Sequence, residues 1–375
     1  MARSSVKFVL IVCILASFVV STSGLTSNKF WTGDTQENVA QWKEGTYCPV
    51  REFNRFVNSI FLPDNVGLYL EEKMGVDAGY YMTTYIRDIM TGTLVYWIFA
   101  GMWHLFIYVV WVKDFFLAER RPLPTDAIIV DQMLLAQSSI FLYAALPVFS
   151  GFLIENKLTM TYYYIDEVGG WPKYFALLVL YMVFVEIGIY WMHRILHTNK
   201  VLYKYIHSLH HKYNSAVTLT PWSSIAFHPV DGVLQASPYV AGIFLVPCHY
   251  YTHVFLVFFS AVWATNIHDS LWGDTEPLMG SKYHLLHHTH YHYNYGQYFI
   301  FCDYFWGTLR MPERSLLNPK RTSSKLDKVL DSMTNDTDNM VDVKVKVGEE
   351  SPVKPAQEAS TTTTTRTRSA VKKAK

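Results

Sequence analysis

The sequence predicts an all-α integral membrane protein, a multi-span helical bundle with a histidine-rich cap at one membrane face. Half of the 375 residues are hydrophobic, and only 17% are charged, against about 25% in an ordinary soluble domain. Three apolar segments approach the roughly 20 residues that a spanning helix requires. Fourteen of the fifteen histidines lie between His193 and His292. The net charge of +1 gives no electrostatic reason to expect nucleic-acid binding.

Residues 1–24 are expected to be a signal peptide or a signal anchor. Arg3 and Lys7 precede an apolar run from Phe8 to Val20, and small residues follow it, in the order of a secretory signal. Cleavage is favoured because the run is short for a span. Either outcome directs residues 25–88 to the lumenal side. That region is rich in aromatic residues and has no clear period.

Three predicted spans follow within residues 89–192. They are Ile89 to Val112, Ala127 to Ile154, and Tyr174 to Met192. Pro147 is expected to kink the second span, because proline lacks a backbone N–H and clashes with the preceding turn.

The charges of the connecting loops predict the orientation of the spans. The first loop carries the cations Lys113, Arg120 and Arg121. The next loop carries the acids Glu155, Asp166 and Glu167. The positive-inside rule therefore puts the first loop in the cytosol. The third span then ends on the cytosolic side, at His193.

Residues 193–312 are predicted to form a catalytic region that contains a membrane hairpin at about 239–264. A single span there would put the histidines before and after it on opposite membrane faces. Two short helices with a break near Pro247 and Cys248 return the chain to the face from which it came.

Residues 313–375 are predicted to be a disordered cytosolic tail, because polar and charged residues dominate them. The tail ends in Lys372-Lys373-Ala374-Lys375, which is similar to a dilysine signal for retrieval to the endoplasmic reticulum. The glycosylation sequon at Asn335 is expected to be unused, because this topology leaves it in the cytosol.

Eight histidines form three clusters with helical spacing. They are His193 and His197; His207, His210 and His211; and His284, His287 and His288. Residues three and four apart share one face of a helix, so each cluster can aim at one point. Imidazole is the commonest protein metal ligand and suits iron, zinc and copper. Eight imidazoles are too many for one structural ion, so we expect three converging helix ends to cage two metal ions.

The remaining histidines differ in their chance of joining such a centre. His268 is a further expected ligand and His228 a less certain one, whereas His290 and His292 alternate and cannot share a helical face. We expect His104, His249 and His253 to be satisfied core or interface residues. Ligating histidines need acceptors for their second nitrogen, and four acidic residues are candidates by position in the sequence: Glu186, Asp231, Asp269 and Asp303. Glu186 also lies within a span, where an ionisable side chain marks a functional site by default.

The histidine clusters, in this order after several spans, resemble those of the fatty acid hydroxylase superfamily of membrane di-iron oxidases. The phrases between the clusters resemble the sterol C-5 desaturases, especially the plant-type enzymes that act on delta-7 sterols. These phrases run from Glu186 to Arg194, from Leu202 to Tyr205, from Ala226 to Gly232, from Asn266 to Asp269, from Asn294 to Gly296 and from Phe305 to Arg310. In related plant sequences, histidines tend to stand where this chain has Tyr293 and Gln297.

The resemblance implies a reaction and its partners. Two iron ions and O2 would introduce the C5–C6 double bond into a delta-7 sterol taken from the membrane. Oxygen accepts four electrons, two from the sterol and two from NAD(P)H through a reductase and cytochrome b5. The His-Pro-Gly-Gly motif of a fused cytochrome b5 is absent, so a separate cytosol-facing donor is expected. The implied location is the endoplasmic reticulum membrane, with the active site and carboxyl terminus in the cytosol.

Two other functions stay open from the sequence. A sterol C-4 methyl oxidase or a fatty acid hydroxylase would use the same di-iron centre, and the histidine clusters alone do not separate these activities. A non-catalytic membrane metal carrier is the alternative from another class. A carrier needs ligands along a transport path, whereas here they are expected to gather at one membrane face.

Overall fold

The computed structural model describes residues 35–112, 122–269 and 275–312. The expected signal segment, the cations of the first loop, and the carboxyl-terminal tail with its sequon and lysine-rich end lie outside the described residues. Within the described ranges every extended regular element is a helix, and β structure is limited to two isolated bridges. The prediction of an all-α membrane protein is confirmed.

In the described part of the chain, three helices precede the first span: α2 (Thr35–Glu44), α3 (Pro49–Phe61) and α4 (Asp64–Met74). They occupy the region in which the sequence shows no clear period. The inward face of α3 buries Asn54 and Asn58 together with Val50. Apolar residues also recur along α3 at helical spacing, at Val50, Phe53, Val57 and Ile60, so the expectation of no clear period is wrong for this helix.

The first candidate span consists of α5 (Val76–His104) and the π-helical turn η1 (Leu105–Val110). The helix begins at Val76 rather than at the predicted Ile89. Its first turns bury polar residues, among them Tyr80, Thr84 and Arg87. These residues hide the start of the span from a hydropathy pattern.

The second candidate span joins α6 (Asp126–Tyr143) to α7 (Ala145–Glu155). The α-helix is interrupted at Ala144, three residues before Pro147, rather than at the proline itself. The physical reason is that proline disturbs the helix one turn earlier, at the carbonyl of Tyr143.

The third candidate span is α8 (Trp171–Thr198), which ends among the first histidines. No more than a third of the most apolar part of each of the three spans is buried inside the protein. The remaining apolar surface is suited to contact with lipid.

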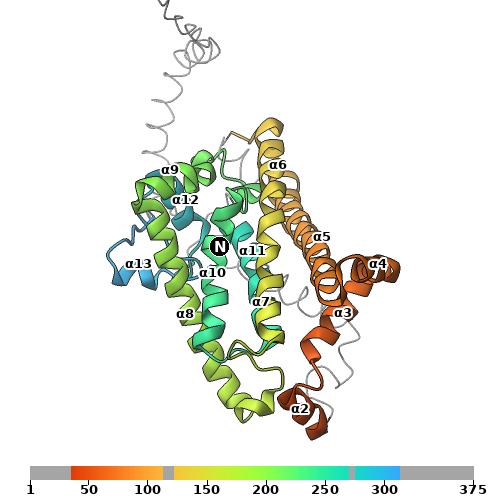
Figure 1. Cartoon of the computed structure of the whole chain (residues 1–375). Helices are drawn as coiled ribbons and strands as arrows, with labels where there is room; N and C mark the ends of the chain where they lie inside the picture. Colours follow the sequence, from red (N-terminus) through yellow and green to blue (C-terminus); the bar gives the residue numbers. More distant parts are fainter. Residues whose placement is uncertain (1–34, 113–121, 270–274, 313–375) are drawn as a thin grey trace, which may run out of the picture. The chain divides into compact units, whose positions relative to one another are not determined.

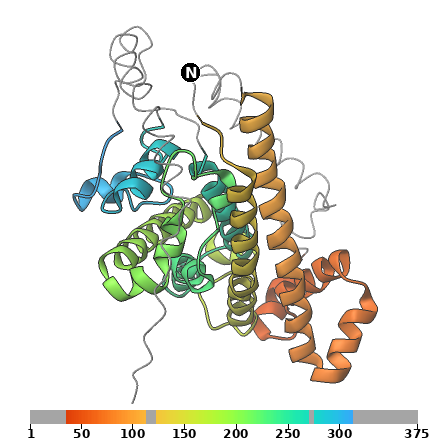
Figure 2. The ribbon, with the colours of Figure 1, turned by 90° about the horizontal axis from the view of Figure 1, so that it is seen from above.

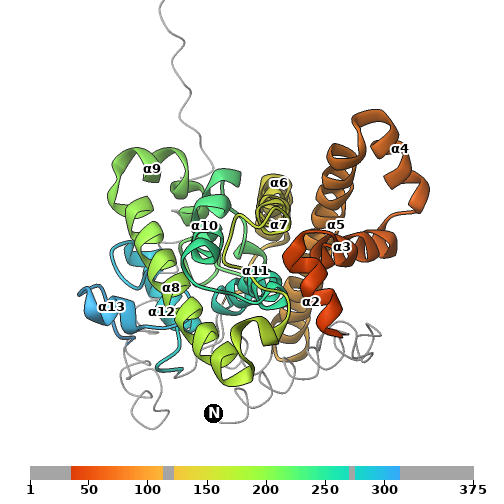
Figure 3. The same cartoon turned by 60° about the horizontal axis from the view of Figure 1, so that its bottom comes forward.

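The expected hairpin region contains α10 (Pro229–Leu245) and α11 (Tyr250–Ile267), with the break at Val246 to His249. Backbone bonds from Tyr162 N to Cys248 O (3.1 Å) and from Tyr250 N to Tyr162 O (2.9 Å) hold this break against the loop after α7. Figures 1 and 3 show α10 and α11 between α8 on one side and α5 to α7 on the other. A Cβ added to Gly188 of α8 would lie only 2.7 Å from the Cβ of Pro238, so α8 and α10 pack very closely.

The carboxyl-terminal end of α8 lies among short elements. These are α9 (Lys200–Tyr205), the 3-10 turns η4 (His207–Lys212) and η5 (Pro221–Ser223), α12 (Ser281–His290) and α13 (Phe301–Phe305). Of these elements, η4 and α12 carry histidines. Figure 2 views the bundle from this end. A further 3-10 turn, η3 (Ile165–Val168), precedes α8.

Candidate metal centre

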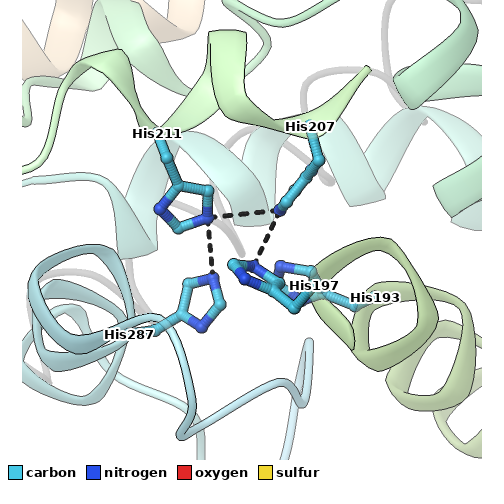
Figure 4. Close-up of side chains that lie close together, drawn as sticks. All are labelled: His193, His197, His207, His211 and His287. Atoms are coloured by element: carbon cyan, nitrogen blue, oxygen red, sulfur yellow. Dashed lines mark hydrogen bonds between the residues drawn. The ribbon is translucent and has the colours of Figure 1, made fainter. Parts of the chain in front are cut away.

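Nine buried histidines form two groups at the end of the bundle formed by α8, η4 and α12. The five-histidine group consists of His193, His197, His207, His211 and His287. The four-histidine group consists of His210, His268, His284 and His288. Within each group the potential ligand atoms lie within 4.8 Å of one another. Figure 4 shows the five-histidine group, whose rings come from α8, η4 and α12.

The two groups in space do not match the three clusters in the sequence. His193 and His197 project together from α8, one turn apart. The second cluster divides: His207 and His211 join the first pair, whereas His210 faces the other group. This cluster lies on a 3-10 turn rather than on an α-helix.

The third cluster divides in the same way. His287 belongs to the five-histidine group, while His284 and His288, four residues apart on α12, belong to the other. His268, at the carboxyl-terminal end of α11, completes the four-histidine group. Each group therefore takes residues from at least three segments of the chain.

The imidazoles of each group meet through their Nε2 atoms. In the five-histidine group, His207 lies 2.9 Å from His197 and 3.2 Å from His211, and His211 lies 3.1 Å from His287. In the four-histidine group, His268 lies 3.3 Å from His210 and 3.1 Å from His284, and His284 lies 3.1 Å from His288.

Hydrogen bonds on the other side of the rings set the tautomers of four histidines. The Nδ1 atoms of His193 and His287 donate to the carbonyls of Tyr295 (3.0 Å) and Tyr293 (2.8 Å). Nδ1 of His268 donates to the Ala264 carbonyl at 2.7 Å. Nδ1 of His207 donates to Oδ2 of Asp231 at 2.7 Å. Because each acceptor carries no proton, the proton is on Nδ1 and a neutral ring has a bare lone pair on Nε2.

The imidazoles are held in the neutral form that binds metal. Burial lowers the pKa of His210 to about 3, with a contribution from the neighbouring His207. Burial, with charge repulsion from other imidazoles, also lowers the pKa of His211, His284, His287 and His288 well below the ordinary value. Such rings stay neutral at physiological pH and can act as ligands.

This donor set fits a pair of cations. Nε2 of His211 lies between the bare Nε2 atoms of His207 and His287, and a single N–H can donate to only one of them. The bare Nε2 of His193 is buried without any partner. Converging lone pairs without a shared proton are unfavourable, and a cation at the centre of each group removes that cost.

The four expected acidic partners make different contacts. Asp231 accepts a hydrogen bond directly from His207, a member of the five-histidine group. Asp269 accepts a hydrogen bond from the indole Nε1 of Trp103 at 3.2 Å.

The expectation that Glu186 bonds a histidine is wrong. Its carboxylate accepts bonds from the backbone N–H groups of Gln297 (3.1 Å), Tyr298 (3.0 Å) and Phe299 (3.0 Å). Two helical turns of α8 separate Glu186 from His193, about 10 Å along the helix axis. Glu186 therefore lies deeper in the bundle than the imidazoles.

Asp303 likewise bonds no imidazole, against the expectation for it. Its carboxylate accepts from the backbone of Tyr295 and Gly296, at 2.8 Å each, and from Oγ1 of Thr308 at 2.7 Å. Glu186 and Asp303 thus hold from two sides the loop that supplies the Tyr293 and Tyr295 carbonyls. Backbone carbonyls have no residue-type signature, so the sequence could not reveal these partners.

The other histidines lie outside both groups. His228, expected as a less certain ligand, instead caps the start of α10, where its Nδ1 accepts from Val230 N at 3.2 Å. His249 bonds the Tyr163 carbonyl (2.7 Å), and His253 bonds Tyr181 (3.0 Å) and Ser150 (3.2 Å). His104, His290 and His292 belong to neither group.

A cavity adjoins both histidine groups on the side of α10 and α11. His193 lines it from the five-histidine group, and His210, His268 and His284 line it from the other. The rest of its wall is largely apolar or aromatic, with Ile189, Phe227, Tyr239, Ala261 and Ala264. An apolar cavity bordered by potential metal ligands is suited to a hydrophobic substrate.

Replacing Asp231 with asparagine should weaken the centre without unfolding the protein. The amide keeps the size of the side chain but withdraws the negative charge that orients His207 and raises its basicity. We expect metal affinity or turnover to fall roughly 10–100-fold. Metal titration of the purified variant checks this, with Asp166→Asn in the loop before α8 as a control. Unchanged affinity and turnover in Asp231→Asn would contradict this role.

Comparison with known proteins gives consistent relatives. A family model described as fatty acid hydroxylase matches residues 178–308. A delta(7)-sterol-C5(6)-desaturase of Nicotiana tabacum is 40% identical over 265 residues, covering 69% of this chain and 92% of that protein. A putative delta(7)-sterol-C5(6)-desaturase of Arabidopsis thaliana is 37% identical, covering 69% and 89%. A delta(7)-sterol 5(6)-desaturase of Gibberella zeae is 37% identical, covering 57% and 68%. No solved structure matches the chain.

Proposed function

The chain belongs to the delta(7)-sterol C5(6)-desaturases of the fatty acid hydroxylase family, and we propose that its two histidine groups hold the two iron ions of that activity. The protein is an oxidoreductase that introduces the C5–C6 double bond into delta-7 sterols. The observation that carries the metal proposal is the convergence of nine buried imidazoles into two groups.

The proposed ligands are the nine grouped histidines. Iron supplies the capacity to activate O2 and to remove hydrogen from an unactivated C–H bond. The tautomers support this assignment, since His193, His207, His268 and His287 direct bare Nε2 lone pairs inward. Asp231 and the carbonyls of Tyr293, Tyr295 and Ala264 keep these rings in orientation, which is the usual task of outer-shell partners.

The cavity beside the histidines is the proposed sterol site. Its space of about 70 Å³ is smaller than a sterol ring system, so it receives only the part of the rings that carries the reacting carbons, from which Ile189, Phe227 and Tyr239 exclude water. The cavity lies between helices with lipid-exposed surface, so the sterol is proposed to enter sideways from the membrane. The contribution of the protein is to place C5 and C6 beside the histidine groups.

The electron supply and the location follow from the reaction. The sterol gives up two electrons as two C–H bonds become a C=C bond, and complete reduction of O2 to water needs two more. We propose that NAD(P)H supplies them through a reductase and a separate cytochrome b5. The proposed location is the endoplasmic reticulum membrane, with the histidine groups facing the cytosol, where such donors act.

Expression in cells that lack C-5 desaturase activity, followed by sterol profiling, tests the function. We expect the delta-7 sterol to be consumed and the delta-5,7 diene to appear. The same cells with an empty vector control for residual activity. Products oxidised at the C-4 methyl group, or hydroxylated fatty acids with no diene, would contradict the assignment.

A further inference from the structure

A second cavity, with charged side chains in its wall, lies at the opposite end of the bundle from the histidine groups, between α3, α5, α7 and α11. Asn54, Arg87, Asp88 and Glu155 line it. The two ends of the second candidate span show this separation. Asp131, near the start of α6, bonds Lys212 beside His211, whereas Glu155 lies at the far end of the span, where α7 ends. Figure 1 accordingly shows α3 and the end of α7 away from α9 and α12. Arg87 and Asp88 lie within the candidate span Val76–Val110, where ionisable side chains point to a function by default.

The charged pair at the centre of this cavity is only partly satisfied. Nε of Arg87 pairs with Oδ1 of Asp88 at 2.9 Å. Both terminal nitrogens of Arg87 reach the same oxygen, Oδ1 of Asn54, over 3.3 Å. The second carboxylate oxygen of Asp88 is buried without a hydrogen-bond partner. With Arg87 only 7% and Asp88 4% exposed, water outside the protein does not satisfy them.

Glu155 differs from Asp88 because its carboxylate is already occupied. Its Oε1 accepts from the hydroxyl of Tyr80 at 2.5 Å, and its Oε2 accepts from Tyr81 at 3.0 Å. The free capacity for hydrogen bonding is therefore concentrated at Asp88, as acceptor, and at Arg87, whose five N–H groups exceed the bonds that it makes.

The cavity has room for more than a single water molecule. It encloses about 140 Å³, whereas one water needs roughly 10–15 Å³ of such space. Its other walls are apolar, with Phe53, Val57, Val148, Val254 and Phe258. Apolar walls around a few converging polar groups are typical of a small-molecule site.

We propose that this cavity binds the hydroxyl group of a membrane amphiphile. A hydroxyl group donates and accepts at once, so its hydrogen can meet Oδ2 of Asp88 while its oxygen accepts from Arg87. The charges of Arg87 and Asp88 cancel, and the nearby Glu155 disfavours an anionic head group. Sterols share this neutral chemistry with other hydroxyl lipids such as ceramides. The site is separate from the histidine groups and does not depend on the proposed reaction.

Photoaffinity labelling of the full chain in phospholipid nanodiscs tests the proposal. The probe is a sterol with a free 3-hydroxyl group and a diazirine on its hydrocarbon part, and labelled peptides are mapped by mass spectrometry. We expect saturable labelling on α3 or α5, which line this cavity and not the one beside the histidine groups, and an unlabelled sterol should suppress it. Suppression by ceramide at lower concentrations than by sterol supports the same site with ceramide as the preferred lipid. Labelling that does not saturate, or that a sterol lacking the hydroxyl group suppresses equally, overturns it.

Two variants separate binding from folding. Arg87→Met with Asp88→Leu replaces both partners of the buried pair, a change that proteins often tolerate. Gly151→Leu keeps every charge and fills the cavity, since a Cβ at Gly151 meets nothing within 4 Å. Both should reduce this labelling at least about tenfold.

The matched control is Glu72→Leu with Lys73→Met, which likewise replaces an ion pair of adjacent residues, at an exposed position of α4. It should leave the labelling unchanged. Persistent labelling in Gly151→Leu overturns the proposal even if the double variant fails to fold.

Discussion

Replacing His287 with alanine should abolish formation of the delta-5,7 diene while the protein remains in the membrane. The ring takes part in the five-histidine group through Nε2, 3.1 Å from that of His211. Its loss removes a proposed ligand outright, so we expect at least about a 1,000-fold loss of turnover, more than the 10–100-fold effect of losing an outer-shell partner. Sterol profiling and metal analysis of the purified protein measure the result.

The same change at His268 tests the other group. His268 lies 3.1 Å from His284 and 3.3 Å from His210. If each group holds one iron, His268→Ala and His287→Ala should each lower the iron content from about two towards one per chain, and both should be inactive. Metal content reports on the site independently of turnover.

His292→Ala supplies the matched control, because this histidine is close in sequence but lies in neither group. It should keep both the iron and the activity. Full activity in His287→Ala or His268→Ala, or equal iron loss in His292→Ala, would contradict the assignment of the groups.

Replacing Glu186 with alanine should destabilise the histidine groups indirectly, by releasing the loop whose carbonyls bond His193 and His287. The carboxylate accepts from three backbone N–H groups, those of Gln297, Tyr298 and Phe299, and it is 1% exposed. A buried donor left without a partner costs about 1–3 kcal/mol, so the three together should cost several kcal/mol. The adjoining Tyr295 carbonyl should then release Nδ1 of His193, to which it is bonded at 3.0 Å.

The measurable results are a lower melting temperature, weaker metal binding and lower turnover in Glu186→Ala. Glu186→Gln should be milder, because its amide oxygen still accepts hydrogen bonds. Glu52→Ala, at an exposed position of α3, controls for the loss of a carboxylate. A Glu186→Ala protein as stable and active as the wild type would show that this anchor is dispensable.

The sequence predicted the features that depend on local composition. Long apolar runs identified the three spans, and the break near Pro247 was visible as a pause between two apolar stretches. It could not show the early start of α5, whose first turns bury Arg87 and Asp88. Burial of these polar groups removed the hydropathy signal there, and only a partner on another helix, Asn54 of α3, explains why Arg87 is buried.

For the metal centre too, the sequence predicted the local features and only the packing between helices decided the rest. Spacing alone indicated that eight histidines act together, because residues three or four apart share a helical face. Only the tertiary structure decided that His207 and His210 belong to different groups, that His268 joins one of them, and that His228 caps a helix instead. Those outcomes depend on where helix ends and backbone carbonyls meet across the bundle. Such long-range packing leaves no periodic trace in the chain.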